Sequence, residues 1–271
     1  ADPLEVRIIQ VLGHPDDAGV DISAMLTSNQ VRQVFNGKIV KECKRIPAKV
    51  QKDELENRKD LRNLLTVTID GDDAKDFDDA ISIVKNEKGY LLYVHIADVS
   101  HYVKENSALD QEAYLRGNSI YVCDRVVPML PFDLSNGICS LNPNVDRLTI
   151  TCAMQVDEKG NLMTYNVFPS VIHSDKRCTY KKVNACLAGD ETILEEYSEV
   201  KDLLFTLESL AKLLKKQSHN RGCIDFNTKE AKIIMDKNGY PVDVTVLERG
   251  FAEQMIEECM ILANVCVAHH M

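Results

Sequence analysis

The sequence predicts a mixed α/β (α+β) fold in which antiparallel-rich β-sheets are surrounded by helices. Two observations support this class. Runs of β-branched and aliphatic residues are joined by short turn-forming segments such as 86–89, a pattern typical of β-hairpins. Two longer stretches, 200–220 and 251–271, instead repeat apolar residues at helical spacing. With 271 residues, of which 45% are hydrophobic, the chain can bury a sizeable core.

The N-terminal part of the chain is predicted to be irregular. A strand-like run over 1–13 leads into a loop rich in Gly, Pro and Asp at 11–22. Residues 31–46 are expected to form a short helix and its continuation, and the highly charged residues 47–62 a helix-prone linker. The chain has no initiator Met and ends inside an apolar helical pattern, so we expect it to be a piece of a longer protein.

The remaining elements follow from local periodicity. The amphipathic helix is the clearest, because five leucines between residues 203 and 214 fall on one face. The elements expected after the linker are, in chain order, strands at 64–69, 80–85 and 90–99, a helix at 107–116, strands near 119–127 and 147–157, the amphipathic helix at 200–220, a hairpin at 231–249 and a buried helix from Phe251.

Composition limits the classes of protein to which the chain belongs. A net charge of −10 and a pI near 5.2 argue against a surface that attracts nucleic acid as a whole. A local phosphate site remains compatible with this charge, because salt confines each charge to about 8–10 Å. The nine cysteines are odd in number and contain no CxxC pair, which predicts neither a disulfide framework nor a zinc site. We therefore expect a cytoplasmic protein with no membrane span and no obligate protein partner.

An unusual cluster of carboxylates lies between two strand-like runs. Residues 70–79 contain six aspartates, which repel one another and are depleted in strands, so a positive partner is expected among them. An EF-hand loop that starts at Asp70 would need Gly and Glu where the chain has Lys75 and Ile81. The aspartyl-phosphatase pattern also fails, because Asp76-Phe77-Asp78 lacks the following Thr or Val. A solvated acidic loop is the simplest alternative.

The carboxylate pattern favours a magnesium site. Mg²⁺ takes hard oxygen ligands, and two such ions about 3.5–4 Å apart promote phosphodiester hydrolysis. Asp76 and Asp78 can point the same way in extended backbone, and Asp70 can reach across the loop. Asp79 would supply another ligand or a general base.

Four motifs in order carry a family resemblance. The chain contains "TIDGDDAKDFDDAISI", "VHIADVSHYV", "VVPMLPFDLSNGICSLNPNVDRLTITCAM" and "IEECMILANV". In these segments it resembles the ribonuclease II/ribonuclease R (RNB) family. The resemblance implies an RNB-type catalytic domain over 61–271, truncated at its C-terminal side. It also implies that residues 1–60 are the tail of a preceding barrel domain and a charged linker.

The resemblance further implies a function and a site. It predicts a 3′→5′ hydrolytic exoribonuclease that uses two Mg²⁺ ions, or Mn²⁺ as a substitute, on single-stranded RNA with a free 3′ end and releases nucleoside 5′-monophosphates. The family's catalytic and metal-binding carboxylates correspond to Asp70, Asp76, Asp78 and Asp79. Tyr121 corresponds to the tyrosine that packs against the terminal nucleotides, and such base stacking contributes about 1–3 kcal/mol per base.

Other polar residues are further candidates for substrate binding. The two glutamates of the last helix need partners, since carboxylates are costly in apolar surroundings, and a buried salt bridge is the alternative to RNA contact. His95 and His101 are expected to be structural. The family's downstream arginine segment and flanking barrels lie outside this chain, so we expect its cleavage to be impaired. A different two-metal phosphohydrolase and a non-enzymatic RNA-binding module remain open. The additional candidates are Asn142, Asp146, Arg147, Arg221, Glu257 and Glu258.

Overall fold

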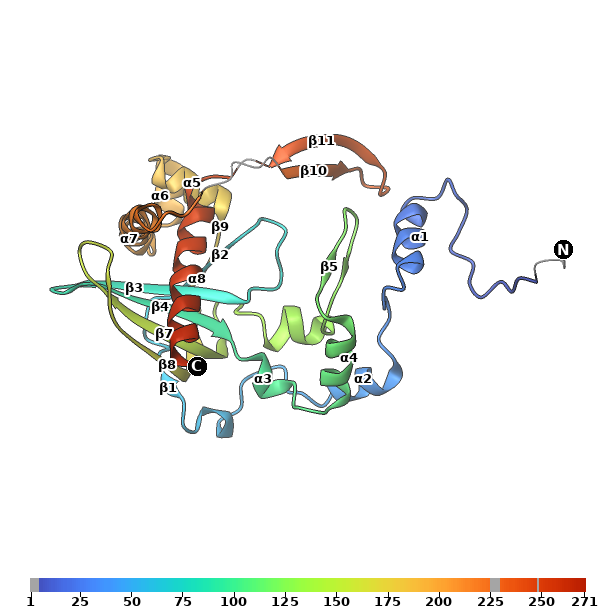
Figure 1. Cartoon of the computed structure of the whole chain (residues 1–271), viewed down its shortest axis with the longest axis horizontal. Coiled ribbons are helices and arrows are strands. Elements are labelled where there is room, and N and C mark those ends of the chain that lie inside the picture. The colour runs from blue at the N-terminus through green and yellow to red at the C-terminus, as the bar shows by residue number, and fades with distance from the viewer. Residues whose placement is uncertain (1–4, 225–229, 248) are drawn as a thin grey trace.

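The structure, a computed structural model, describes residues 5–224, 230–247 and 249–271. Its centre is a seven-stranded mixed sheet with the order β1-β8-β7-β4-β3-β2-β9 (Figure 1). Neighbouring strands are antiparallel except for the pairs β1–β8 and β2–β9. The strands of this sheet are β1 (Lys59–Asp60), β2 (Val67–Asp70), β3 (Asp79–Asn86), β4 (Gly89–Ala97), β7 (Asp146–Val156), β8 (Leu162–His173) and β9 (Lys176–Thr179).

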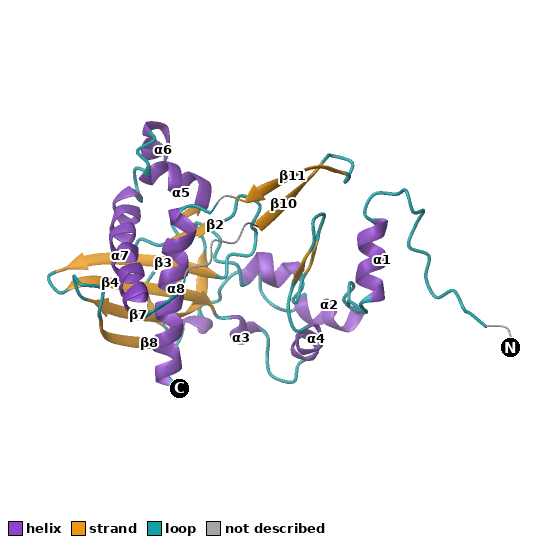
Figure 2. Ribbon diagram, turned by 45° about the horizontal axis from the view of Figure 1, so that its top comes forward, coloured by secondary structure: helices purple, strands orange, loops and turns teal. Residues whose placement is uncertain are grey.

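Helices cover this sheet, and two small hairpins stand outside it (Figures 1 and 2). The hairpins are β5 (Ile120–Tyr121) with β6 (Val126–Val127) and β10 (Glu230–Met235) with β11 (Pro241–Leu247). The helices are α1 (Val20–Ser28), α2 (Gly37–Cys43), α3 (Val99–Tyr102), α4 (Ala108–Arg116), α5 (Tyr180–Leu187), α6 (Glu191–Glu196), α7 (Lys201–Asn220) and α8 (Phe251–His270), with a 3₁₀ turn at Asp53–Leu55 and a π-type turn at Asp133–Ile138.

The main core lies between the sheet and the pair α7 and α8. The five leucines of α7 that share the apolar face are all buried, as their spacing predicts. Met255 and Cys259 of α8 join the same cluster, together with sheet residues such as Leu92 and Met154. A second cluster packs α2, α3 and α4 around Leu109. The predicted mixed fold class, rich in antiparallel pairs and surrounded by helices, is therefore confirmed.

Several local predictions need correction. The charged segment 47–62 forms a single 3₁₀ turn and the short strand β1 rather than a helix. The helix expected within 31–46 begins only at Gly37, because Asn36 caps it by accepting from the N–H groups of Lys38 and Ile39. The helix α1 begins inside the expected loop at 11–22. The last helix is buried on one face only, since Ile261 is 40% exposed.

Two further expectations concern histidines and membranes. His95 is buried and bonds with the hydroxyls of Ser82 and Thr151, while His101 contacts Glu54. Both histidines therefore sit in structural networks, as predicted. Within the described ranges, none of the helices combines the length and apolar character needed to cross a membrane. The cytoplasmic location and the barrel origin of residues 1–60 stay predictions.

Candidate active site

The loop between β2 and β3 brings the aspartates to one end of the sheet. Asp70 is the last residue of β2 and Asp79 the first of β3, and these strands pair antiparallel. In such a pair, the end of the first strand and the start of the second strand lie at the same end of the sheet. Buried Ile69 and Ala80 fix the two strand ends in the core. The short loop between β2 and β3 therefore brings Asp70 and Asp79 to the same end of the sheet.

The second half of this loop is held by Phe77. Its side chain is 3% exposed and packs with Ala80 and Leu141. Its N–H donates to Ser140 Oγ at 3.0 Å, and its carbonyl accepts from the N–H of Leu141 at 2.9 Å. Because Phe77 points inward, its neighbours Asp76 and Asp78 are left on the solvent side.

The carboxylates act on one another electrostatically. Burial raises the pKa of Asp70 to about 7, and the charges of Asp79, Asp78 and Asp76 add to this rise, whereas Arg177 opposes it. Burial and then the charge of Asp78 raise the pKa of Asp79 to about 6. The pKa of Asp78 is also raised, by burial and then by Asp76, although Asp78 is the most exposed of the four. Ionising this cluster without a cation therefore costs free energy.

The chemistry of this cluster fits a divalent cation. Hard carboxylate oxygens are the ligands that Mg²⁺ prefers. The Oδ2 atom of Asp70 is buried and has no hydrogen-bond partner, which is uncommon for a polar atom and leaves this oxygen free to bind a cation. Across the described parts of the chain, however, no three His, Cys, Asp or Glu side chains are gathered closely enough to hold a metal ion. The carboxylates thus lie in an open arrangement, as expected for like charges that repel.

Tyr121 lies beside these carboxylates, although 45 residues separate it from Asp76. Its hydroxyl donates to Asp76 Oδ2 at 2.9 Å, and its ring, on the β5–β6 hairpin, is 65% exposed. Burial and then this hydrogen bond raise the pKa of Tyr121 to about 12. An exposed ring next to the aspartates is available for stacking on a base; that role stays a prediction.

Asn142 and Arg147 donate hydrogen bonds to main-chain carbonyls, and their predicted contact with substrate stays a prediction. Arg147 is 6% exposed, and its Nε donates to the carbonyl of Ser140 at 2.7 Å. Asn142 donates to the carbonyl of Asn136 at 3.1 Å. Both side chains therefore hold the main chain of the segment that carries Ser140, the partner of Phe77. Asp146 is likewise occupied, by an ion pair with Arg62 at 3.0 Å.

The remaining candidates lie just after α7 and on α8. Arg221 is exposed just after α7, with no described contact to the aspartates. Glu257 forms a salt bridge with Arg249 at 2.8 Å, which is one of the two predicted alternatives, but both side chains are 51% exposed rather than buried. Glu258 is half-buried. Burial and then the charges of Glu258 and Asp79 raise the pKa of Cys259, the neighbour of Glu258 on α8.

One residue of the site has no signal in the sequence. Arg177 belongs to β9, which pairs with β2. Its Nη2 donates to the carbonyls of Gly71, Asp72 and Ala74 at 3.3, 2.7 and 3.2 Å. A basic residue about 100 positions from the loop that it contacts carries no local pattern. Only the strand pairing reveals this contact.

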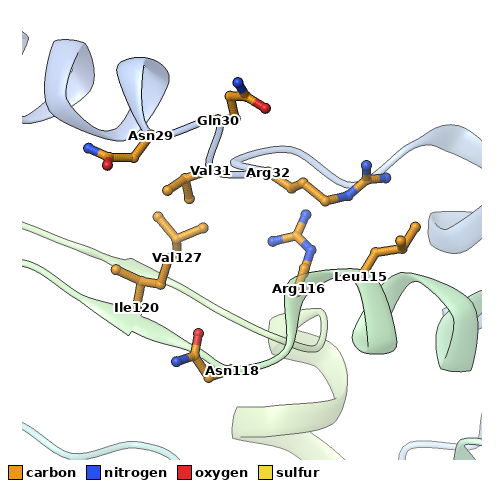
Figure 3. Close-up of a pocket in the computed structure, with 9 residues that line it drawn as sticks. All are labelled: Asn29, Gln30, Val31, Arg32, Leu115, Arg116, Asn118, Ile120 and Val127. Atoms are coloured by element: carbon orange, nitrogen blue, oxygen red, sulfur yellow. The ribbon is translucent and has the colours of Figure 1, made fainter.

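A cavity of about 360 Å³ lies elsewhere in the molecule (Figure 3). Val31, Ile120 and Val127 form part of its lining, and none of the four aspartates does. Arg32 and Arg116 also face it, and both are paired with buried Glu112. Because these charges are largely compensated within the protein, we assign the chemistry to the aspartate cluster rather than to this cavity.

Known proteins resemble this chain over most of its length. Residues 58–271 match the RNB domain. The chain is 49% identical to Ribonuclease R of Thermotoga maritima and 46% identical to Ribonuclease R 1 of Lactococcus lactis, each over 97% of its own length but only 38% and 32% of theirs. The structure of Mycoplasma genitalium RNase R in complex with ribose methylated single-stranded RNA has a TM-score of 0.87 and 36% identity, over 94% of this chain and 40% of that one.

Proposed function

The chain belongs to the RNB domain family, and from this premise we propose that it forms the catalytic core of a 3′→5′ exoribonuclease acting on single-stranded RNA. The observation that carries this proposal is the cluster of Asp70, Asp76, Asp78 and Asp79 beside the exposed ring of Tyr121. The chain spans 38% of its Thermotoga relative, so the activity of the whole protein belongs to the proposal.

The residues divide into those that hold ions and those that place RNA. In the proposal the four aspartates hold two Mg²⁺ ions, which when bound supply an activated water and charge compensation for the leaving oxygen. Asp70, half-buried at the end of β2, would hold these ions together with Asp76, Asp78 and Asp79. Tyr121 stacks on the terminal base and aligns the last phosphodiester with the carboxylates.

This division suits degradation rather than sequence-specific recognition. Stacking tolerates every base, because each base has a π-face, and carboxylate-held ions contact phosphate oxygens that are the same in every nucleotide. We therefore propose nucleoside 5′-monophosphates as products, released one at a time from a free 3′ end. The structures of Mycoplasma genitalium RNase R in complex with ribose methylated single-stranded RNA and with double-stranded RNA support RNA as the class of substrate.

The test compares three substrates with and without Mg²⁺. A 5′-labelled oligoribonucleotide with a free 3′ hydroxyl, the same oligomer with a blocked 3′ end, and a phosphomonoester are incubated with the chain and with a form extended to the length of its relatives. We expect Mg²⁺-dependent release of mononucleotides from the free 3′ end, slow in the chain and fast in the extended form. Preferred hydrolysis of the phosphomonoester would favour a different phosphohydrolase, and RNA binding without cleavage in both forms would favour a binding module.

A further inference from the structure

Residues 71–74, in the first half of the loop between β2 and β3, curl around the guanidinium group of Arg177. The Nη2 atom of Arg177 donates to three carbonyls within four residues, those of Gly71, Asp72 and Ala74. One donor atom shared by three acceptors requires the chain to curl around it. The conformation of residues 71–74 is therefore tied to the position of this guanidinium.

The position of Arg177 is itself fixed from two sides. Its backbone lies in β9, which pairs in parallel with β2 so that Arg177 is opposite Thr68, two residues before Asp70. Its guanidinium lies 5.1 Å from the centroid of the Phe77 ring, within the range of a cation–π contact. Arg177 thus bridges the strand that ends at Asp70 and the residue that separates Asp76 from Asp78.

The guanidinium has no carboxylate partner among the interactions described for it. Its Nε is buried without a hydrogen-bond partner, and the three hydrogen bonds of Nη2 go to main-chain carbonyls. A cation that served only to neutralise the acidic cluster would be expected to pair with a carboxylate. The geometry instead indicates a device that shapes the loop.

From this geometry we infer that Arg177 is a positioning residue that sets the approach of Asp70 to Asp76 and Asp78, and thereby the affinity of the site for a divalent cation. The inference rests on the proposed function, because it takes these aspartates as the ion-binding groups. It assigns to Arg177 neither contact with RNA nor proton transfer. Its effect is transmitted through the main chain of residues 71–74.

The sign of the effect distinguishes positioning from simple electrostatics. A positive charge near the site repels a divalent cation, so its removal should tighten binding if charge alone mattered. If Arg177 positions the ligands, its removal should weaken binding despite the lost repulsion. Lysine keeps the charge but not the planar fork of donors, so Arg177→Lys should restore affinity only in part.

The test measures Mn²⁺ binding to the chain by calorimetry and by electron paramagnetic resonance, together with hydrogen exchange of the loop amides in the metal-free protein. The variants are Arg177→Gln and Arg177→Lys. The matched control is Lys176→Gln, which removes a neighbouring positive charge of β9 whose Nζ donates to the carbonyl of Glu196 instead. We expect about tenfold weaker Mn²⁺ binding and faster exchange at residues 71–78 for Arg177→Gln, an intermediate effect for Arg177→Lys, and less than a twofold change for the control.

Three outcomes would overturn the inference in distinguishable ways. Unchanged or tighter Mn²⁺ binding by Arg177→Gln, with normal binding by the unsubstituted chain, would leave the metal site intact and remove the positioning role. Unchanged loop exchange would show that the three carbonyl contacts do not constrain residues 71–74. If the unsubstituted chain bound no Mn²⁺, the proposed ion site would fail first. A melting temperature of each metal-free variant within a few degrees of the original verifies that the fold is retained.

Discussion

Two polar clusters lie on the same central strands, and they differ in how their hydrogen-bonding groups are satisfied. In the middle of the sheet, His95 bonds with Ser82 and Thr151, and Ser82 bonds in turn with Thr66. All four residues are fully buried. At the end of the sheet, Asp70 has a buried oxygen with no partner. The hydrogen-bonding groups of the first cluster are paired within the protein, whereas the second cluster keeps an unpaired buried oxygen.

The contrast separates polar groups that stabilise from those that bind. A buried polar group that has its partners adds modestly to stability, but it is expensive when a partner is removed. A buried carboxylate without a partner is already a cost to the fold, and proteins keep such groups mainly at functional sites. The two clusters should therefore respond in opposite ways to substitution.

The largest expected effect is on cleavage. In the form extended to the length of the relatives, Asp78→Asn should reduce the single-turnover rate by more than about 100-fold, because it removes a proposed ion ligand. RNA affinity should change little, because it depends mostly on phosphate and stacking contacts elsewhere.

The matched control for this substitution is Asp72→Asn. Asp72 is equally acidic and lies in the same loop, but its side chain is exposed and only its carbonyl is used, by Arg177. We expect its rate to remain within about twofold of the original. Equal damage from Asp72→Asn and Asp78→Asn would mean that the four ligands are wrongly chosen.

The second effect is on stability and its pH dependence. The pKa of Asp70 is raised in the folded state to about 7, whereas its value in the unfolded chain is near 4. The contribution of Asp70 to the free energy of unfolding is therefore fully present below pH 4 and is lost as the pH rises through 7. Asp70→Asn should therefore stabilise the metal-free chain at pH 8 by about 1–3 kcal/mol, since one pKa unit corresponds to about 1.4 kcal/mol. The gain should nearly vanish at pH 4, as measured by urea unfolding.

The structural cluster supplies the opposite case. Thr151→Val leaves His95 Nδ1 without its partner and should cost about 1–3 kcal/mol. Burial lowers the pKa of His95 to about 3, so the ring stays neutral and this cost should be the same at pH 5 and pH 8. A stabilising Thr151→Val, or an Asp70→Asn effect that does not depend on pH, would erase the distinction between the clusters.

The sequence predicted those features of both clusters that depend on neighbouring residues. The turn at 86–89, the helix α7 and the grouping of Asp70 to Asp79 all follow from local spacing, and the structure contains each of them. The role of Tyr121 stays a prediction, although its proximity to Asp76 agrees with it.

Features that depend on distant contacts could not be predicted in this way. Arg147 was a candidate for substrate binding because its segment resembles the family's stretch beside the active site, but the sequence did not predict that its side chain is buried and donates to the carbonyls of Ser140 and Gly137. Glu257 was expected to be buried because its neighbours are apolar, but the helix turns it outward to Arg249. Arg177 drew no prediction, because its loop contacts lie more than 100 residues away. In each case the surroundings of the side chain depend on contacts with distant segments or on the rotation of a helix, which local sequence patterns do not show.

The last expected effect is the stabilisation of the chain by Mg²⁺. A ligand that binds only the folded state adds about 2.7 kcal/mol at 100 times its dissociation constant. For a domain of this size, each kcal/mol raises the melting temperature by about 2–4 °C. Saturating Mg²⁺ should therefore raise the melting temperature of the chain by several degrees in calorimetry at pH 8. Asp78→Asn should lose most of this rise, whereas Thr151→Val should melt lower but keep the full increment, because the His95 cluster is complete without an ion. An equal rise in Asp78→Asn would place the ion elsewhere. If the unsubstituted chain showed neither a rise in melting temperature nor a heat of binding, the unpaired oxygen of Asp70 would not be a cation ligand.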